Sequence, residues 1–432
     1  MVFWWVRVGV ACGVSSVCAI NWLGIAAILE HAERYYGRSA STLNAVSNLY
    51  LGVYCVTCLP CGYLVDKNVR IALLTGAFTQ ALGAALTVIP GFETLVLGSC
   101  VAAVGQPLIV STAAAFARSY VPERWTARVT TVVSVANNVG SAAAYLIAPR
   151  VVRPFGVRGW LAVRAAYALF FFLSALATFG RSKKYESIRY SLQVARLVRR
   201  PKLALLLAAY AIGQGGYWAW AELLDSALLG ACGETCVGDV GAVVTVSASI
   251  FAVLLSALVR KERRSLELLL CGTQGAAAVA AIALVAATAS KKLWAVALAW
   301  TCFSAASTPV MPFGAELAAT IAPPHLVGAA LASLFLGAEL LSTAFGFWFG
   351  AAFEGPTLVF AVFLATALAA LANLAMLLAP HDDDDDDDDV DFDFATFTPP
   401  LRTLLLRTPP EDDDKDRDVD PPPITRAVGT FI

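Results

Sequence analysis

One acidic and three aromatic side chains lie deep within apolar runs of the sequence. Glu339 lies near the middle of one run, Trp22 near the middle of another, and Tyr217 and Trp218 share a third. A carboxylate in such a run needs a cavity or a partner, and aromatic faces attract cations. Glu339 is therefore a candidate counter-charge for a bound cation or a proton carrier, with a structural, hydrogen-bonded glutamate as the alternative. For the three aromatic residues, the alternative is ordinary packing.

Amide and further acidic side chains occur in similar runs. Gln106 is followed by Pro107, which removes one helix hydrogen bond and allows a bend. The Gln106 amide is a candidate to bind a solute, and an interhelical hydrogen bond is the alternative. Glu222 and Asp225 are three residues apart and share a helix face. They either line an outer vestibule or pair with Arg164 or the outer arginines.

The composition excludes a soluble enzyme. The chain has 432 residues, of which 58% are apolar and 15% charged, and its mean hydropathy is +0.69. A soluble domain carries about 25% charged residues. The sequence contains no GxxxxGK[ST], GxSxG or HExxH motif, so neither an ATP-driven pump nor an enzyme is indicated. We therefore expect a polytopic membrane protein that is not an enzyme.

Apolar segments long enough to cross a membrane recur along the chain. In lipid each must be an α-helix, because only a helix satisfies all its own backbone groups. The fold class that we expect is thus all-α, with twelve transmembrane helices. The expected spans are 9–30, 42–65, 71–90, 94–117, 129–149, 159–180, 203–229, 239–259, 267–289, 293–320, 327–352 and 356–379.

Charge sets the expected orientation and the domain limits. If the N-terminus lies in the cytosol, the segments that flank the expected spans carry 18 Lys and Arg residues on the cytosolic side and 7 on the opposite side. This bias places both termini in the cytosol; which membrane holds the chain is left open. A basic cytosolic linker, 181–202, separates two six-helix bundles, 1–180 and 203–380.

The C-terminal segment, 381–432, differs sharply from the rest. It holds 17 acidic and 5 basic residues, a net charge of −12, and it opens with eight consecutive aspartates. The remaining chain has 26 basic and 15 acidic residues, a net charge of +11. Like-charged blocks repel themselves and do not pack. We expect a disordered acidic cytosolic tail, and we attribute the basic body to membrane loops rather than to nucleic-acid binding.

A charged motif follows the second expected span. Gly62 begins the run Gly-Tyr-Leu-Val-Asp-Lys-Asn-Val-Arg, which ends at Arg70. Asp66 is expected to cap or pair with a neighbouring helix end, and Lys67 and Arg70 to pair across an inner gate. Glu316, near the inner end of the tenth span, is expected to play the corresponding structural role in the second bundle by pairing with Arg260, Arg263 or Arg264.

This motif, after the second of twelve spans, resembles the loop signature of the major facilitator transporters, although Val69 stands where that family prefers glycine. Further segments are similar to the FLVCR-like (feline leukaemia virus subgroup C receptor-related) transporters. The resemblance implies export or uptake of small organic cations such as choline and ethanolamine, or of haem. It also suggests a glutamine where this chain has Glu339. The segments that carry it are Asn21-Trp22, Leu64 to Lys67, Gly105 to Ile109, Ile212 to Asp225 and Pro312 to Glu316.

Cysteine and histidine give no cofactor or metal site. Cys55, Cys58 and Cys61 lie on one face of an apolar helix without a fourth ligand, which favours buried thiols. The three histidines are far apart in sequence, which weakens a haem assignment. Cys232 and Cys236 lie in an outer loop, where they either form a disulfide or stay reduced.

The sequence therefore predicts a monomeric transporter of a small solute in a lipid bilayer, working by alternating access of two bundles around a central site. Secondary active and facilitative transport are both open. The alternatives are a carrier of haem or another small organic solute, and a receptor or scaffold that acts through the acidic tail. The predicted substrate site is Trp22, Gln106, Tyr217, Trp218 and Glu339, and the predicted inner gate is Asp66, Lys67, Arg70 and Glu316.

Overall fold

The computed structural model describes residues 3–180, 194–195, 197–228, 234–259, 263–290, 292–352 and 356–378, although for some helical residues within these ranges only the backbone is described. The described residues belong to one compact unit. The predicted acidic tail and most of the predicted basic linker lie outside the described residues.

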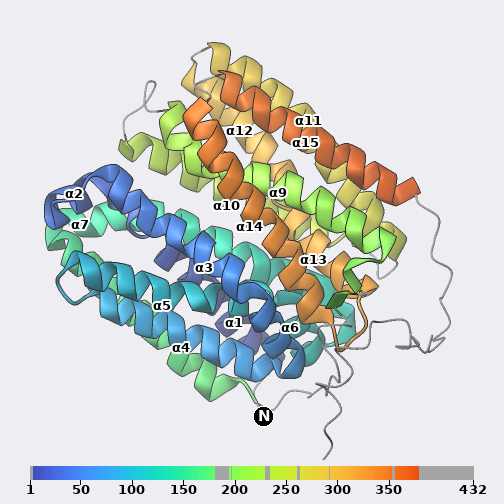
Figure 1. Ribbon diagram of the computed structural model, residues 1–432, viewed down its shortest axis with the longest axis horizontal. Coiled ribbons are helices and arrows are strands. Elements are labelled where there is room, and N and C mark those ends of the chain that lie inside the picture. Colours follow the sequence, from blue (N-terminus) through green and yellow to red (C-terminus); the bar gives the residue numbers. More distant parts are fainter. Residues whose placement is uncertain are drawn as a thin grey trace, which may run out of the picture. The chain divides into compact units, whose positions relative to one another are not determined.

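Helices form two groups along the chain, here called the first half and the second half (Figure 1). The first half comprises α1 (Trp4–Leu23), α2 (Leu29–Tyr36), α3 (Ala40–Lys67), α4 (Val69–Thr87), α5 (Phe92–Val110), α6 (Ala113–Tyr120) and α7 (Thr126–Thr178). The second half comprises α9 (Pro201–Leu228), α10 (Glu234–Ser256), α11 (Arg263–Ser290), α12 (Leu293–Ser307), α13 (Val310–Ile321), α14 (Val327–Ala352) and α15 (Pro356–Leu378). Ten of the described helical stretches are long and apolar enough to cross a membrane.

Local sequence explains where several predicted spans are interrupted. The first ends as α1 before Gly24 and continues through a 3-10 turn into α2. The tenth divides into α12 and α13 at Thr308 and Pro309, since proline lacks the N–H that would continue the helix. The predicted fifth and sixth spans both fall within α7, which is interrupted at Gly156, where φ is +68°. A positive φ of this kind favours glycine.

Asn68 produces the sharp turn between the second and third predicted spans. Its extended backbone ends α3, and its side chain accepts a hydrogen bond from the Ile71 N–H at 3.0 Å, which caps the first turn of α4. The cap satisfies one of the backbone donors that a helix start leaves free. This turn fixes the direction of the chain directly after Asp66.

Contacts between the halves come from a few helix pairs. Within the halves, α1 packs on α7, α4 on α5, and α9 on both α14 and α15. Across the halves, α3 packs on α14 and α7 on α10. The α3–α14 contact holds Asp66, and the α7–α10 contact holds Arg150. We call the corresponding ends of the unit the Asp66 end and the Arg150 end.

Among the residues whose side chains are described, the apolar core is continuous between the halves at the Asp66 end. There, Val65 and Phe116 of the first half share one buried cluster with Phe313 and Leu331 of the second. Towards the Arg150 end, the described apolar side chains fall into separate clusters for each half. Buried apolar area stabilises a contact in rough proportion to its size, about 25 cal/mol per Å². The halves are therefore held together more strongly at the Asp66 end.

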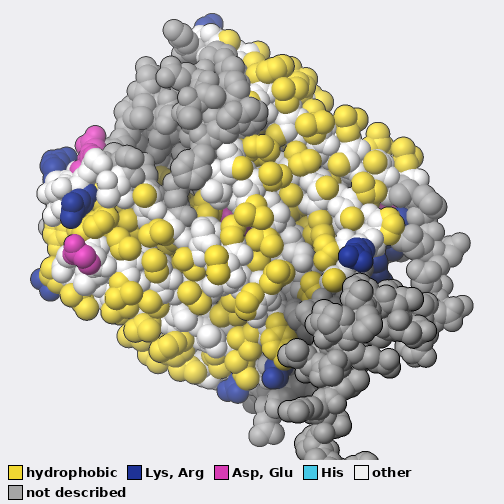
Figure 2. Space-filling model, in the orientation of Figure 1, with side chains coloured by type: hydrophobic (Ala, Val, Ile, Leu, Met, Phe, Trp, Pro, Cys, Tyr) yellow, Lys and Arg dark blue, Asp and Glu magenta, His cyan; other side chains and the backbone are white. Residues whose placement is uncertain are grey.

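The outer surface is apolar over the middle of the unit. Large exposed apolar side chains include Leu254, Val279, Trp294 and Leu371. Figure 2 shows apolar side chains over most of the described surface, with charged side chains mainly near its margins. A soluble protein does not expose a continuous apolar surface of this extent. The chain is an integral, multi-pass membrane protein.

Candidate functional site

A central cavity of about 130 Å³ lies between the two halves. All five residues of the predicted substrate site lie in its wall, which draws on α1, α5 and α7 of the first half and on α9, α10, α12, α13 and α14 of the second. The lining residues are Trp22, Leu23, Gln106, Val110, Asn137, Asn138, Ser141, Ala142, Tyr145, Tyr217, Trp218, Gly238, Gly241, Thr245, Trp300, Met311 and Glu339.

Glu339 is the one Asp, Glu, Lys, Arg or His side chain in the described lining of this cavity. It lies midway along α14 and is 5% exposed. Cys18, Tyr54 and Tyr210 lie within electrostatic range of its carboxylate. These neighbours come from both halves, so the carboxylate lies at the boundary between them. A negative group in a water-poor cavity attracts a cation more strongly than the same group in water.

Aromatic rings line the cavity on both sides of the boundary. Trp218 stacks on Phe335, with ring centroids 6.5 Å apart and an angle of 8° between the rings. The Tyr217 ring meets Phe303 edge-on, and its hydroxyl lies 3.4 Å from Thr308 Oγ1. These contacts fix the orientation of both lining rings. Aromatic faces in such a cavity attract a desolvated cation by about 2 kcal/mol each.

Trp300 of α12 is a lining residue that the sequence did not single out. The chain has ten tryptophans, and Trp300 lies within one more apolar run, where neither Ala299 nor Thr301 beside it marks it as a site residue. Only the packing of α12 against α10 and α11 reveals its position beside the cavity. The cavity therefore holds three tryptophans, of which the sequence predicted two.

The Gln106 amide offers a hydrogen-bond acceptor to the cavity. Its side chain is 5% exposed, and its Oε1 atom has no hydrogen-bond partner among the residues that the structure describes. A buried acceptor without a partner costs about 1–3 kcal/mol. A solute that donates a hydroxyl or ammonium hydrogen could satisfy it. Asn137, also in the wall, donates instead to the Ser15 carbonyl at 3.1 Å and so ties α7 to α1.

The end of α1 that presents Trp22 is held from three directions. Trp160 Nε1 donates to the Gly24 carbonyl at 2.7 Å, and Arg164 Nη2 to the Asn21 carbonyl at 3.5 Å. Asn21 Nδ2 donates to Gln80 Oε1 at 2.7 Å. The first two bonds satisfy backbone carbonyls that the end of α1 leaves free, and the three bonds together fix the backbone on both sides of Trp22.

Asp66 caps a helix of the opposite half. Its two carboxylate oxygens accept hydrogen bonds from the backbone N–H groups of Gly328 at 2.5 Å and Ala329 at 2.9 Å, in the first turn of α14. A carboxylate at a helix N-terminus is favoured by the helix dipole as well as by the hydrogen bonds. The helix-capping contact expected of Asp66 is therefore present, and it joins the two halves.

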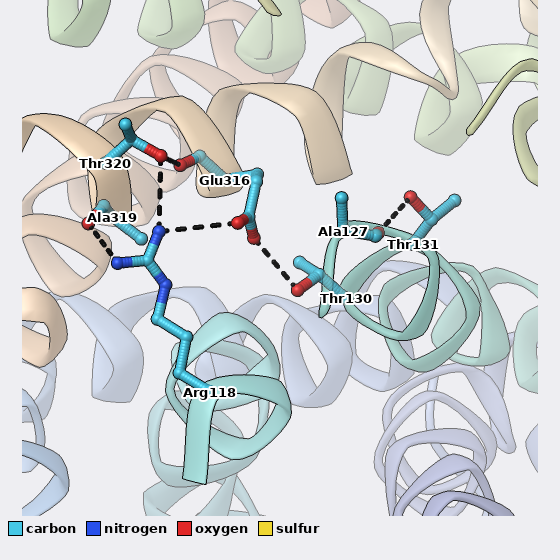
Figure 3. A network of polar contacts seen from close by, with 7 residues as sticks. All are labelled: Arg118, Ala127, Thr130, Thr131, Glu316, Ala319 and Thr320. Carbon is cyan, nitrogen blue, oxygen red and sulfur yellow. Dashed lines mark hydrogen bonds and ion pairs between the residues drawn. The ribbon is translucent and has the colours of Figure 1, made fainter. Parts of the chain in front are cut away.

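The prediction that Glu316 pairs with a base of its own half was wrong, because its carboxylate contacts the first half instead. Figure 3 shows the carboxylate between Arg118 and Thr130 of the first half: Arg118 Nη2 lies 3.3 Å from Oε1, and Thr130 Oγ1 donates to Oε2 at 3.0 Å. Arg118 also donates to the Ala319 carbonyl at 2.6 Å. Among the expected partners, Arg263 and Arg264 pair with Glu267 at 3.1 and 3.4 Å, and Arg260 lies outside the described residues.

Lys67 and Arg70 were expected to pair across the boundary, whereas the contacts described for them lie within the first half. Arg70 Nε donates to the Phe179 carbonyl at 2.9 Å, and the Lys67 ammonium lies 5.8 Å from the centre of the Tyr63 ring. Their placement follows from the sharp turn at Asn68, which directs α4 back along its own half. Among the described residues at the Asp66 end, Arg118 makes a cationic contact between the halves.

At the Arg150 end, the described polar contact between the halves is exposed. Arg150 of α7 lies 3.4 Å from Asp239 of α10, and their side chains are 56% and 47% exposed. Such a pair contributes about 0–1 kcal/mol. Among the described contacts, those at the Asp66 end are the stronger: a helix cap, a partly buried ion pair and a shared apolar core.

The structure describes some, but not all, of the cysteine and acidic residues that the sequence singled out. Cys55, Cys58 and Cys61 are free thiols, and Cys236 is disulfide-bonded, while Cys232 lies outside the described residues. The side chains of Glu222 and Asp225 are likewise not described. In the part of the chain that the structure describes, no group of three or more His, Cys, Asp or Glu residues is placed to hold a metal ion.

Comparison with known proteins gives a family match and distant relatives. The family described as Major Facilitator Superfamily matches residues 10–336. The human choline/ethanolamine transporter FLVCR2 is 25% identical over 239 residues, 49% of this chain and 45% of that protein. The Danio rerio choline/ethanolamine transporter flvcr2b is 22% identical over 252 residues, 52% of each chain. The chain thus spans about half the length of these curated relatives.

Solved structures share the fold at low sequence identity. The major facilitator transporter FucP, in its outward conformation, has a TM-score of 0.68 and 15% identity, over 86% of this chain and 98% of that chain. The human organic anion transporter MFSD10 (TETRAN) has a TM-score of 0.68 and 13% identity, over 86% and 98% of the two chains. The overall arrangement of helices is therefore one that known transporters adopt.

Proposed function

Because the chain belongs to the major facilitator superfamily of transporters, we propose that it moves a small organic cation, such as choline or ethanolamine, across a membrane by alternating access. The observation that carries this proposal is the lining of the central cavity. Glu339 is its one charged group among the described residues, and three tryptophans and Tyr217 supply aromatic faces. A carboxylate and several ring faces around one small volume suit an ammonium group.

The hydrogen-bonding groups of the cavity suit the same solutes. Choline and ethanolamine each carry a hydroxyl two carbons from the charged nitrogen, so a hydroxyl donor would lie near the ring-bound cation. The free acceptor on Gln106 can take that hydrogen. The relatives named choline/ethanolamine transporters support this choice of substrates, although the match to them covers only part of each chain.

Cavity size favours such solutes over haem, which was the other substrate implied by the resemblance. Sites for drug-sized ligands are about 300–1,000 Å³, whereas this cavity measures about 130 Å³. Haem is larger than a typical drug molecule and also carries carboxylates, which Glu339 would repel. Another small organic cation remains a candidate for the same cavity.

The two ends of the unit correspond to the two gates of an alternating-access cycle. With both termini in the cytosol, as the distribution of Lys and Arg predicts, the Asp66 end faces the cytosol. The structure would then be the state that is closed towards the cytosol. In this state Asp66, Arg118 and Glu316 hold the halves together. To open this end, the halves must break these contacts together with the shared apolar core.

Radiolabelled uptake into cells that express the chain tests the proposal. We expect saturable uptake of choline, ethanolamine or both, with more than tenfold loss in Glu339→Gln at equal surface expression. Glu93→Gln, which changes an exposed acid outside the cavity, is the matched control and should transport normally. A receptor or scaffold would show no saturable uptake and would be indifferent to both substitutions.

A further inference from the structure

A second cavity, of about 110 Å³, lies at the Arg150 end. We call it the vestibule. Tyr145 of α7 and Gly238 of α10 belong to the linings of both the vestibule and the central cavity, so the two spaces adjoin along the α7–α10 boundary. A solute that entered from the Arg150 end would pass the vestibule before it reached Glu339.

The vestibule has the opposite charge balance from the central cavity. Its described lining contains the guanidinium groups of Arg150 and Arg153, the imidazole of His31 and one carboxylate, that of Asp239. Even with a neutral imidazole, the guanidinium groups outnumber the carboxylate. Charges attract or repel over about 8 Å in physiological salt. A simple cation is therefore repelled at the vestibule and attracted at the central cavity, whereas an anionic group is attracted at the vestibule.

Two of the three cationic groups in the described lining of the vestibule, Arg153 and His31, are free to bind an anion. Neither Arg153 nor His31 makes a hydrogen bond or an ion pair in the described part of the chain. Arg150 Nη1 donates to the Leu146 carbonyl of its own helix, and both terminal nitrogens lie 3.4 Å from one oxygen of Asp239. The pair with Asp239 is exposed and weak. Guanidinium groups bind carboxylates and phosphates through paired N–H donors. Two such groups, three residues apart on α7, can face one bound oxyanion.

We propose that the vestibule is a binding subsite for a carboxylate or phosphate group, and that the preferred substrates are small zwitterions that combine such a group with an ammonium group. This inference rests on the proposed function for the cationic part of the substrate. The vestibule binds the anionic group, and the Glu339 cavity binds the ammonium group. An anion on Arg150 also displaces Asp239, and so weakens the contact between the halves at this end.

Ligand-dependent thermal unfolding of the purified full-length chain tests the vestibule without relying on transport. A ligand that binds only the folded state stabilises it by RT ln(1 + L/Kd), where L is the free ligand concentration, so the rise in unfolding temperature with ligand concentration gives the dissociation constant. The probes are choline, carnitine, which is a trimethylammonium carboxylate, and acetate. The variants are Arg153→Gln, Arg153→Lys and Glu339→Gln. Arg158→Gln, an exposed arginine at the same end outside both cavity linings, is the control.

The expected result is a dissociation constant at least tenfold lower for carnitine than for choline in the wild type. Arg153→Gln removes most of this advantage, Arg153→Lys restores part of it, and Arg158→Gln leaves both dissociation constants unchanged. Equal affinities for the two probes in the wild type, or an advantage that survives in Arg153→Gln, would overturn the vestibule proposal.

Failure of the proposed function gives a different pattern. If the central cavity does not bind cations, choline produces no stabilisation and Glu339→Gln changes nothing. Acetate and carnitine would then still stabilise the wild type through Arg153, and the vestibule would hold an anion alone. If no probe shifts the unfolding temperature of a folded chain, both proposals are wrong.

Discussion

Gly62 of α3 and Gly328 of α14 meet backbone to backbone across the boundary between the halves. A Cβ atom added to Gly328 would lie 2.5 Å from the Gly62 carbonyl oxygen, and one added to Gly62 would lie 2.9 Å from the Gly328 carbonyl oxygen. Asp66 caps α14 through the N–H of the same Gly328. The close approach of the two glycines and the cap of Asp66 therefore depend on each other.

Alanine at Gly62 or Gly328 should separate the halves at the Asp66 end. The added methyl groups overlap backbone atoms, which cannot move as a flexible side chain can, and overpacking of this kind costs about 1–3 kcal/mol. Because the cost falls on the state that is closed at this end, the equilibrium should shift towards opening there. Thiol labelling of the buried Cys61 next to Gly62, read by peptide mass mapping, should become several times faster in either variant.

Gly52→Ala provides the control on the same helix. A Cβ at Gly52 meets no atom within 4 Å, so this variant should label and transport like the wild type. Unchanged labelling of Cys61 in both Gly62→Ala and Gly328→Ala would mean that the closed state described here is not the one that the chain mainly occupies.

Arg118 and Glu316 should be energetically coupled. Arg118→Gln leaves the largely buried Glu316 carboxylate with its hydrogen bond from Thr130 but without its cation. When both partners of an ion pair are buried, the loss of one lowers the free energy of unfolding by about 3–5 kcal/mol. Because the Arg118 side chain is partly exposed, the loss of stability in this variant should be smaller. The double variant Arg118→Gln/Glu316→Gln removes both charges and should unfold closer to the wild-type temperature than the sum of the single effects. Strictly additive shifts in a thermal-unfolding cycle would rule out the coupling.

Asp66 and Glu316 show how far the sequence could determine such contacts. The role of Asp66 could be predicted because a carboxylate after a span, next to a short turn, has few uses besides meeting a helix end. The partner of Glu316 could not be predicted from the sequence, because Arg260, Arg263 and Arg264 of the same half lie nearer in sequence than Arg118 does. Arg118 is distant in sequence, and its approach depends on the packing of α6 against α13. Pairing between halves is decided by tertiary geometry, which sequence spacing does not contain.

The Trp160 indole should support binding without touching the cavity. Its N–H donates to the Gly24 carbonyl beside Trp22, and phenylalanine would leave that carbonyl without its donor, at a cost of about 1–3 kcal/mol. The freed end of α1 would displace Trp22. Trp160→Phe should therefore raise the KM for the cation severalfold, with a smaller change in the maximal rate. The control Trp125→Phe alters a ring at the Asp66 end; equal KM changes in both variants would argue for a general loss of stability.

Trp300 and Trp294 give the sharpest test of the aromatic cavity, because they lie on the same helix and differ in their surroundings. Trp300 is 4% exposed and lines the cavity, whereas Trp294 is 68% exposed on the outer apolar surface. A cation held over the Trp300 ring loses about 0.5–2 kcal/mol of attraction when the ring is removed. Trp300→Leu should thus raise the KM for the cation about 2- to 30-fold, Trp300→Phe should raise it less, and Trp294→Leu should leave it unchanged. If both Trp300→Leu and Trp300→Phe had the wild-type KM at normal surface expression, the Trp300 ring would serve packing alone. The cation would then have to be held by Glu339 and the remaining rings.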